Sequence, residues 1–188
     1  MEQATLVRHY QRFHRKRHQE QLDWFRNQPS IEAAIEFAAL SVDWRGKRFS
    51  HQRRIGRQAL LAAKEALLSA VISLQGCSNF DELIELVEAV LDPIDGLGEL
   101  YVYDISLRIG ARLGILPQRV YLHAGTRTGA KVLGLDPRAR AIEVQSLPEP
   151  LRQLSAHEVE DVLCIYKDEL MQRSDQQEDL TRRSSGRC

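Results

Sequence analysis

The sequence predicts an all-α fold, a single helical domain of about six to eight helices, and three observations support this expectation. Apolar residues recur at intervals of three and four along most of the chain. Polar residues that favour helix starts stand in front of several of these stretches. Only residues 141–144 have the character of a strand. We expect the helical domain to span residues 1–172 and a polar tail, 173–188, to be disordered.

The first half of the chain contains three predicted helices. Residues 5–27 are polar and basic and are expected to form the first. Ser30 is placed to cap the second, over residues 31–40, where apolar side chains share one face. A loop is expected at residues 41–50, and a long helix from residue 52 or 57 to residue 74, ended by Gly76.

The second half begins with a cap at residues 79–81 and a helix that runs to about residue 90. A tight turn with one proline and two glycines, residues 92–98, separates it from a helix over residues 99–113. A shorter helix is predicted for residues 124–133. Ser155 and Glu158 have the spacing of a capping box, which begins a last helix that runs to about residue 172.

Composition excludes several classes of protein. No apolar run is long enough to span a membrane, and the first twenty residues lack the apolar core of a secretory signal. The three cysteines, Cys77, Cys164 and Cys188, cannot all pair and lack the spacing of metal ligands. We therefore expect a soluble, cytoplasmic protein with no metal, no cofactor and no membrane partner.

The formal net charge is zero, but basic and acidic residues are segregated along the chain. Residues 1–60 hold twelve Lys or Arg and six Asp or Glu, whereas residues 61–100 hold one and eight. Residues 101–140 are basic again, with seven against two. A basic face, as nucleic-acid binding requires, forms if the first and third blocks meet in the fold.

The most informative segment is the turn with its two flanking helices, at about residues 80–113. Its sequence Ile-Asp-Gly-Leu-Gly ends in Gly96, Leu97 and Gly98, and the two glycines let the backbone turn sharply and approach another molecule. Backbone amides at the start of the next helix lack intrahelical partners and favour an anion such as a phosphate. The alternative is an ordinary turn between helices that ends at a glycine.

This segment resembles the helix-hairpin-helix of the DNA glycosylase superfamily, and the resemblance extends over roughly residues 30–135. It implies contact with the DNA backbone through the hairpin. The chain departs from the family where catalysis is concerned. Bifunctional members carry a lysine where Leu100 stands here, and the family's catalytic aspartate aligns with His123. An imidazole does not supply the negative charge that stabilises an oxocarbenium-like sugar, so we expect the usual glycosylase activity to be absent.

Other candidate residues form three groups. The first is a basic cluster of seven residues in a stretch of thirteen with no acid between them: Arg45, Lys47, Arg48, His51, Arg53, Arg54 and Arg57. It is interpreted as an anion-binding segment or as a solvated loop. Arg127 and Lys131 are spaced to share a helix face, as a second phosphate contact or as solvated charges.

The third group contains candidate catalytic residues for a divergent enzyme, namely Asp104, Asp136 and His123. Asp104 can instead pair with Arg108 one turn later, and a structural role is the preferred interpretation of His123. His14 and His18 have a spacing that can hold a metal ion, but no third ligand is evident, so a solvated helix is expected.

Three functions remain open from the sequence. The favoured one is a protein that binds duplex DNA through largely sequence-independent backbone contacts, without catalysis. The second is a divergent glycosylase or lyase whose catalytic carboxylate has moved. The third is a protein-interaction module, for which the acidic segments 81–99 and 143–179 would supply the binding surface.

Overall fold

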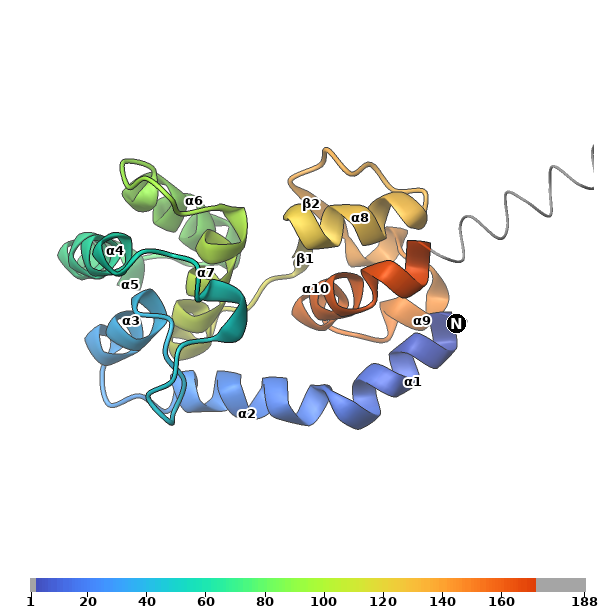
Figure 1. Ribbon diagram of the computed structural model, residues 1–188, viewed down its shortest axis with the longest axis horizontal. Coiled ribbons are helices and arrows are strands. Elements are labelled where there is room, and N and C mark those ends of the chain that lie inside the picture. The colour runs from blue at the N-terminus through green and yellow to red at the C-terminus, as the bar shows by residue number, and fades with distance from the viewer. Residues whose placement is uncertain (1–2, 172–188) are drawn as a thin grey trace, which may run out of the picture. The chain divides into compact units, whose positions relative to one another are not determined.

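The computed structural model describes residues 3–171 and is built almost entirely from helices, which confirms the all-α class (Figure 1). The described residues form two compact units. The central unit comprises residues 16–117, and the terminal unit comprises residues 3–15 and 118–171. The predicted tail, residues 173–188, lies outside the described residues.

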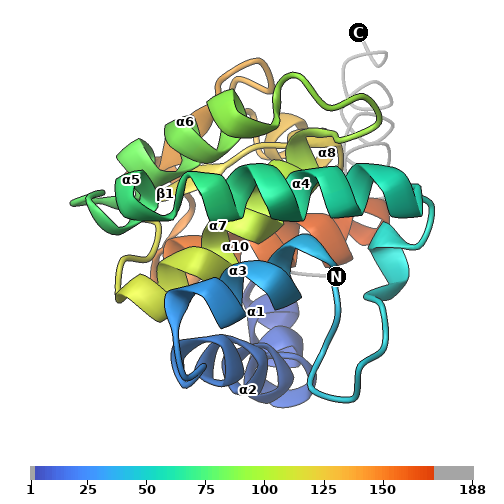
Figure 2. The same cartoon turned by 90° about the vertical axis from the view of Figure 1, so that its left-hand side faces the viewer.

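Helices of the central unit follow one another in chain order. They are α2 (Arg15–Arg26), α3 (Ile31–Ala39), a short 3-10 helix η1 (Ser50–Gln52), α4 (Arg57–Ser69), α5 (Val71–Gln75), α6 (Phe80–Leu91) and α7 (Glu99–Leu113). Helix α3 packs on both α4 and α7, and α6 also packs on α4 and α7 (Figure 2). The core of this unit is therefore made where these four helices meet.

Two of the expected caps are present in the central unit. The Ser30 hydroxyl accepts a hydrogen bond from the amide of Ala33 at 3.2 Å, which begins α3. The Asn79 side chain accepts one from the amide of Glu82 at 3.0 Å, which begins α6. Each bond satisfies an amide that has no partner within its helix, so these boundaries follow from the sequence.

Helices α6 and α7 approach closely at Gly110, which is buried. A Cβ atom on Gly110 would clash with the carbonyl oxygen of Ile115 and would lie 3.4 Å from side-chain carbons of Leu83 and Phe80. On the other side of α7, the hydroxyl of Tyr101 donates to the carbonyl oxygen of Ala39 at 2.7 Å. Helix α7 is thus fixed between α6 and the end of α3.

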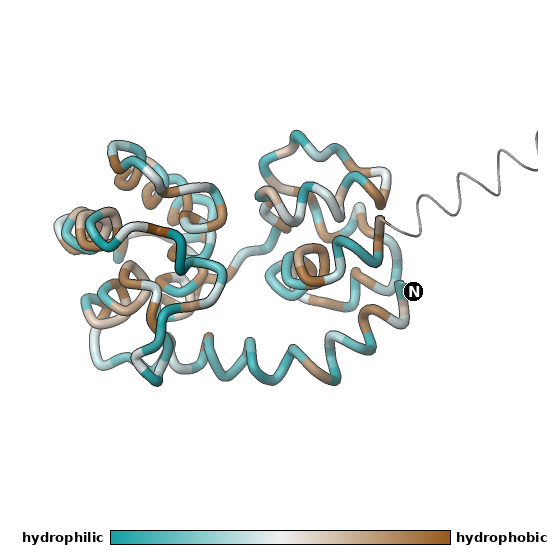
Figure 3. The backbone as a smooth tube through the Cα atoms, viewed as in Figure 1, coloured by the Kyte–Doolittle hydropathy of each residue, from teal (hydrophilic) through white to brown (hydrophobic). Residues whose placement is uncertain are grey.

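Two expected helices are each divided in the structure. The predicted helix over residues 5–27 is interrupted at His14 and forms α1 (Gln3–Phe13) and α2. The division has a physical reason, because α1 buries Leu6, Val7 and Tyr10 in the core of the terminal unit. Most of α2 is hydrophilic (Figure 3), and it belongs to the central unit from Lys16 onward. The predicted helix ending at residue 74 is likewise divided at Ala70.

The terminal unit contains α1 and a second series of elements. These are β1 (Arg119–Tyr121), α8 (Ala124–Val132), β2 (Ala141–Glu143), a 3-10 helix η2 (Val144–Ser146), α9 (Glu149–Arg152) and α10 (Ala156–Ile165). Strand β2 confirms the strand expected at residues 141–144. Strand β1 was not expected, and it pairs antiparallel with β2 so that Val120 stands opposite Ile142. Both side chains are buried in the core of this unit.

Helix α10 is central to the terminal unit and begins at the predicted capping box. The amide and the hydroxyl of Ser155 both donate to a carboxylate oxygen of Glu158, at 3.0 and 2.9 Å. Helix α8 packs on α10 at Gly129, where a Cβ atom would lie 2.9 Å from the carbonyl oxygen of Leu163. The predicted end at residue 172 is not reached without a break, because α10 ends at Ile165 and a turn at Tyr166 precedes further helical residues.

Among residues 3–171, the structure contains no helix with the length and apolar character needed to cross a membrane.

Glu158 makes the stability of the terminal unit depend on pH. Burial opposes ionisation of its carboxyl, but hydrogen bonds from Arg15, at 2.5 and 3.0 Å, and from Ser155 outweigh burial and lower its pKa to about 2. A carboxyl with a depressed pKa stabilises the folded state fully when the pH is above the ordinary pKa of the group, 4.5. This contribution is lost as the pH falls toward 2. Its size is up to about 3 kcal/mol.

We predict that Glu158→Gln removes this contribution. The wild-type protein should lose stability between about pH 5 and pH 2 more steeply than the variant, measured as the free energy of unfolding in urea at each pH. Asp168→Asn, at an exposed position of the same unit, is the control and should leave the wild-type pH profile unchanged. Parallel profiles for the wild type and Glu158→Gln would contradict the prediction.

Candidate nucleic-acid interface

The turn between α6 and α7 has the exposed backbone that the sequence predicts. Gly96 has a φ of +85°, a left-handed conformation that favours glycine, and Gly98 is the N-cap of α7 in an extended conformation. Because the N-cap is a glycine, no N-cap side chain accepts a hydrogen bond from the first amides of α7. A Cβ atom placed on Gly96 or on Gly98 would have no other atom within 4 Å. Ile94 and Leu97, the two apolar residues of the turn, are half-buried. Approach to the first amides of α7 is therefore open.

Acidic side chains limit the electrostatic attraction of this turn. Asp92, Asp95 and Glu99 are all exposed. Glu99 stands in the first turn of α7, where a carboxylate interacts favourably with the helix dipole. A phosphate at this turn would be repelled by these charges, so binding there requires additional cations.

The basic cluster lies between α3 and α4, and part of it stabilises its own loop. Arg45 pairs with the buried carboxylate of Asp43 at 2.5 Å, and hydrogen bonds from Arg45 and Lys47 lower the pKa of that carboxyl although burial opposes the change. Arg48 donates to the carbonyl oxygens of Gln52 and Ile55 at 2.7 and 2.9 Å. The side chain of Arg48, expected as a DNA contact, is therefore used to shape the loop.

Four other basic residues of the cluster extend into solvent. Each has an exposed side chain that makes no side-chain hydrogen bond or ion pair with another residue between 3 and 171; they are Lys47, Arg53, Arg54 and Arg57. Figure 2 places the 41–56 loop, the first turn of α4 and the 92–98 turn along the same, right-hand side of the central unit. We call these four cations and the residues 96–98 the basic end.

A buried arginine on α7 links that helix to the loop that carries part of the basic end. Asp104 lies about one and a half turns after the start of α7, and its Oδ2 atom is 2.7 Å from Nε2 of His51 and 3.2 Å from Nη2 of Arg108. Gln52 donates to the same oxygen and accepts a hydrogen bond from Arg108 at 3.2 Å. Asp104 therefore pairs with Arg108 one helical turn later, which is the structural alternative to a catalytic role in the sequence analysis.

The Arg108 guanidinium is only 2% exposed and also lies over the ring of Phe49, at 4.1 Å from the ring centroid. Burial lowers the pKa of Arg108, and the charge of Asp104 opposes that change. Asp104 thus neutralises a buried charge and connects α7 to the loop.

Two further predicted DNA contacts lie in the terminal unit. Arg127 and Lys131 occupy α8 at the expected spacing. Arg127 donates to the carbonyl oxygens of Pro137 and Ala139, at 2.8 and 3.1 Å, and so orders the loop after α8. Lys131 is exposed. Asp136, the other candidate carboxylate, is exposed in that loop and accepts a hydrogen bond from the amide of Arg138 at 2.9 Å.

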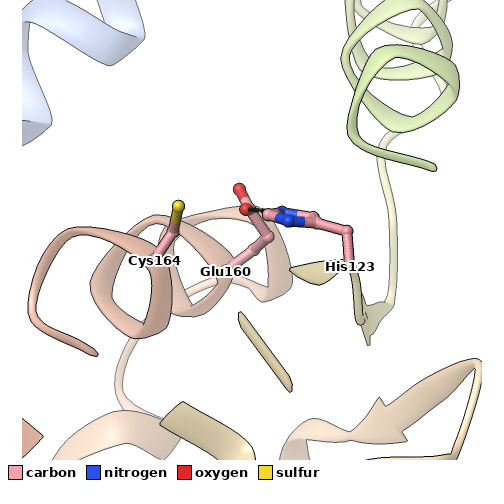
Figure 4. Close-up of side chains that lie close together, drawn as sticks. All are labelled: His123, Glu160 and Cys164. Carbon is pink, nitrogen blue, oxygen red and sulfur yellow. Dashed lines mark hydrogen bonds and ion pairs between the residues drawn. The ribbon is translucent and has the colours of Figure 1, made fainter. Parts of the chain in front are cut away.

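His123, for which a structural role is the preferred interpretation from the sequence, lies in a buried environment of the terminal unit. It is 1% exposed and is the N-cap of α8, and its Nε2 atom is hydrogen-bonded to Oε1 of Glu160 at 2.5 Å (Figure 4). The thiol of Cys164 lies beside this pair, and one donor atom from each residue falls within 4.8 Å of the others. Glu160 and Cys164 were missed as site residues. Their spacing of four residues on a capped helix was the available signal.

Comparison with known proteins gives no match, whether with family models, with curated proteins or with solved structures. The resemblance to helix-hairpin-helix glycosylases consequently depends on the sequence pattern around residues 80–113 alone.

We predict that Asp104→Ala destabilises the protein by about 3 kcal/mol. The variant leaves the Arg108 guanidinium buried without its carboxylate, and breaking a buried pair costs several kcal/mol. Urea unfolding at neutral pH measures the change. Glu85→Ala, an exposed site on α6, is the control and should alter stability by less than about 0.5 kcal/mol. An equal effect of the two variants would show that Asp104 does not stabilise the core.

Proposed function

We propose that this protein binds duplex DNA through phosphate contacts made by the basic end of the central unit. The observation that carries the proposal is the position of Lys47, Arg53, Arg54 and Arg57. These exposed cations are not neutralised by any acid among residues 3–171, and the loop and first turn of α4 that carry them lie along the same side of the central unit as the open turn before α7 (Figure 2). Phosphate oxygens are the ligands that suit both exposed guanidinium groups and the first amides of a helix.

The proposed contacts imply a particular kind of binding. Long basic side chains on a surface loop and backbone amides meet the sugar-phosphate backbone, which carries no direct sequence information. Weak, sequence-independent affinity follows, in the range of about 10⁻⁴ to 10⁻⁶ M at physiological salt. Asp92, Asp95 and Glu99 reduce the affinity further, since they stand beside the turn.

The proposal does not include glycosylase activity. Leu100 stands where the resembling family has a lysine, and His123 where it has an aspartate. Asp104 is engaged with Arg108, Gln52 and His51. A duplex that carries uracil or oxidised guanine should therefore be bound without release of the base, whereas base release that disappears in Asp136→Asn would favour the divergent enzyme.

The first test of the proposal is the salt dependence of binding. With four cations on phosphates, the logarithm of affinity should fall with the logarithm of salt concentration at a slope of about −3.6. Arg53→Ala and Arg54→Ala should each reduce that slope by about one unit without changing stability, as fluorescence anisotropy with a labelled duplex would measure. Lys64→Ala is the matched control. Lys64 also lies on α4, but its charge is paired with Glu36 of α3 at 3.3 Å, so the salt slope should not change.

Two outcomes of this experiment are decisive. A reduced slope in the arginine variants and an unchanged slope in Lys64→Ala would support the basic end as the contact surface. Affinity that does not change between low and physiological salt, in the wild type, would overturn the proposal and favour the protein-interaction module.

A second test concerns the turn itself. Because the φ of Gly98 is −104° and its surroundings are open, other residues fit there without strain. Both Gly98→Asp and Gly98→Asn supply a side-chain N-cap for α7 and should leave stability unchanged or higher by about 0.5 kcal/mol at most. Only Gly98→Asp adds a negative charge, so its DNA affinity should be about tenfold below that of Gly98→Asn at low salt. Equal affinities would exclude phosphate contact at this turn.

A further inference from the structure

We propose that His123, Glu160 and Cys164 form a binding site for one divalent transition-metal ion, with zinc as the ion that fits the donor set best. The site lies wholly within the terminal unit and does not depend on DNA binding. In Figure 4 the ring of His123 points at the carboxylate of Glu160, and the thiol of Cys164 projects from the same side of α10 as that carboxylate.

The local structure brings the donors together for simple reasons. Glu160 and Cys164 are one helical turn apart on α10, so they share a face of that helix. His123 follows β1 and is the N-cap of α8, and its amide donates to the hydroxyl of Thr126 at 2.7 Å. Since α8 packs on α10 through Gly129 and Leu163, the imidazole is held against the donor face of α10.

The chemistry of the donors selects the class of ion. A thiolate and an imidazole favour zinc and other late first-row ions, whereas calcium and magnesium require oxygen ligands. A histidine nitrogen, a cysteine sulfur and a carboxylate oxygen are all established zinc donors. Three protein donors leave one of four tetrahedral positions for water or another ligand, as zinc sites with an open position do.

The distances require only small side-chain movements. With metal–ligand bonds of about 2.1 Å, tetrahedral nitrogen and oxygen donors stand about 3.4 Å apart. A hydrogen bond, and therefore one bridging proton, now joins His123 and Glu160 at 2.5 Å, and all three donor atoms lie within 4.8 Å of one another. Displacement of that proton by a cation would move the first two donors apart by about 1 Å and bring the sulfur closer.

Gly125 leaves space next to the sulfur. It lies in the first turn of α8, and a Cβ atom there would be 3.0 Å from Sγ of Cys164 and 3.8 Å from Cε1 of His123. Cys164 is half-buried, whereas His123 and Glu160 are buried. An ion can therefore reach the site from the side of the sulfur, while the other two donors are shielded from water.

Cobalt(II) is a direct probe of the site, because a cobalt–thiolate bond produces a charge-transfer absorption. The experiment uses the full chain with Cys77→Ser and Cys188→Ser, so that Cys164 is the only thiol. We expect this absorption to saturate at one equivalent of cobalt and to disappear when zinc is added. When Cys164→Ser is introduced into this double variant, the absorption should be abolished. When Glu160→Gln is introduced instead, cobalt binding should weaken by at least tenfold. Protein with Cys164 and Cys188 intact but Cys77→Ser is the matched control and should retain it.

A second readout does not require any variant at His123 or Glu160. In the single-thiol protein, one equivalent of zinc should slow the reaction of Cys164 with a thiol reagent by at least tenfold, with an unchanged circular dichroism spectrum. The proposal is overturned if stoichiometric cobalt gives no charge-transfer absorption, or if zinc leaves the reactivity of the thiol unchanged. The three residues would then form a hydrogen-bonded structural cluster between α8 and α10.

Discussion

The buried charge of Arg108 is the constraint on which the central unit depends. A guanidinium group removed from water needs a compensating carboxylate and hydrogen-bond acceptors, and the chain supplies Asp104 and Gln52. Phe49 adds its ring on one side of the group. Asp104 comes from α7, whereas Gln52 and Phe49 come from the 41–56 loop. The groups that surround the Arg108 side chain therefore connect two segments that are distant in the sequence.

The surface of the basic end follows from that constraint. Because η1 is held against α7 through Asp104, the residues that follow it, Arg53 and Arg54, have fixed backbone positions near the start of α7. Their side chains remain in solvent. Two other arginines of the same cluster, Arg45 and Arg48, are used to order the loop. A segment that looks uniformly basic in the sequence is thus divided into residues that build the surface and residues that are available to a ligand.

Much of the helical structure could be predicted from local sequence, since caps are local interactions. Ser30, Asn79 and Ser155 begin helices where expected, and the turn at residues 92–98 separates two helices as its proline and glycines indicate. The break at His14 could not be predicted, because α1 is amphipathic in its own right and its buried face belongs to a core formed by residues more than a hundred positions later. Strand β1 is three residues long and exists only through pairing with β2.

The contacts of the candidate site residues also differ in how far the local sequence predicts them. The pairing of Asp104 with Arg108 follows from a spacing of four on a helix, and it was anticipated as an alternative. The roles of Arg48 and Arg127 could not be predicted from the sequence, because their hydrogen-bond partners are carbonyl oxygens whose positions depend on the course of a loop. His123 was identified as a single residue, while its neighbours Glu160 and Cys164 come from a helix 37 and 41 positions later and meet it only in the folded terminal unit.

The central claim is that the basic end of the central unit contacts the phosphate backbone, and backbone amide resonances test it most directly. A two-dimensional NMR titration of the isotopically labelled protein with an unmodified duplex, at low salt, reports each amide separately. The account predicts that the largest shift changes fall on residues 53–57 and 96–100 and that they reverse on addition of salt. Changes confined to the acidic face of α6, or to the terminal unit, would contradict it.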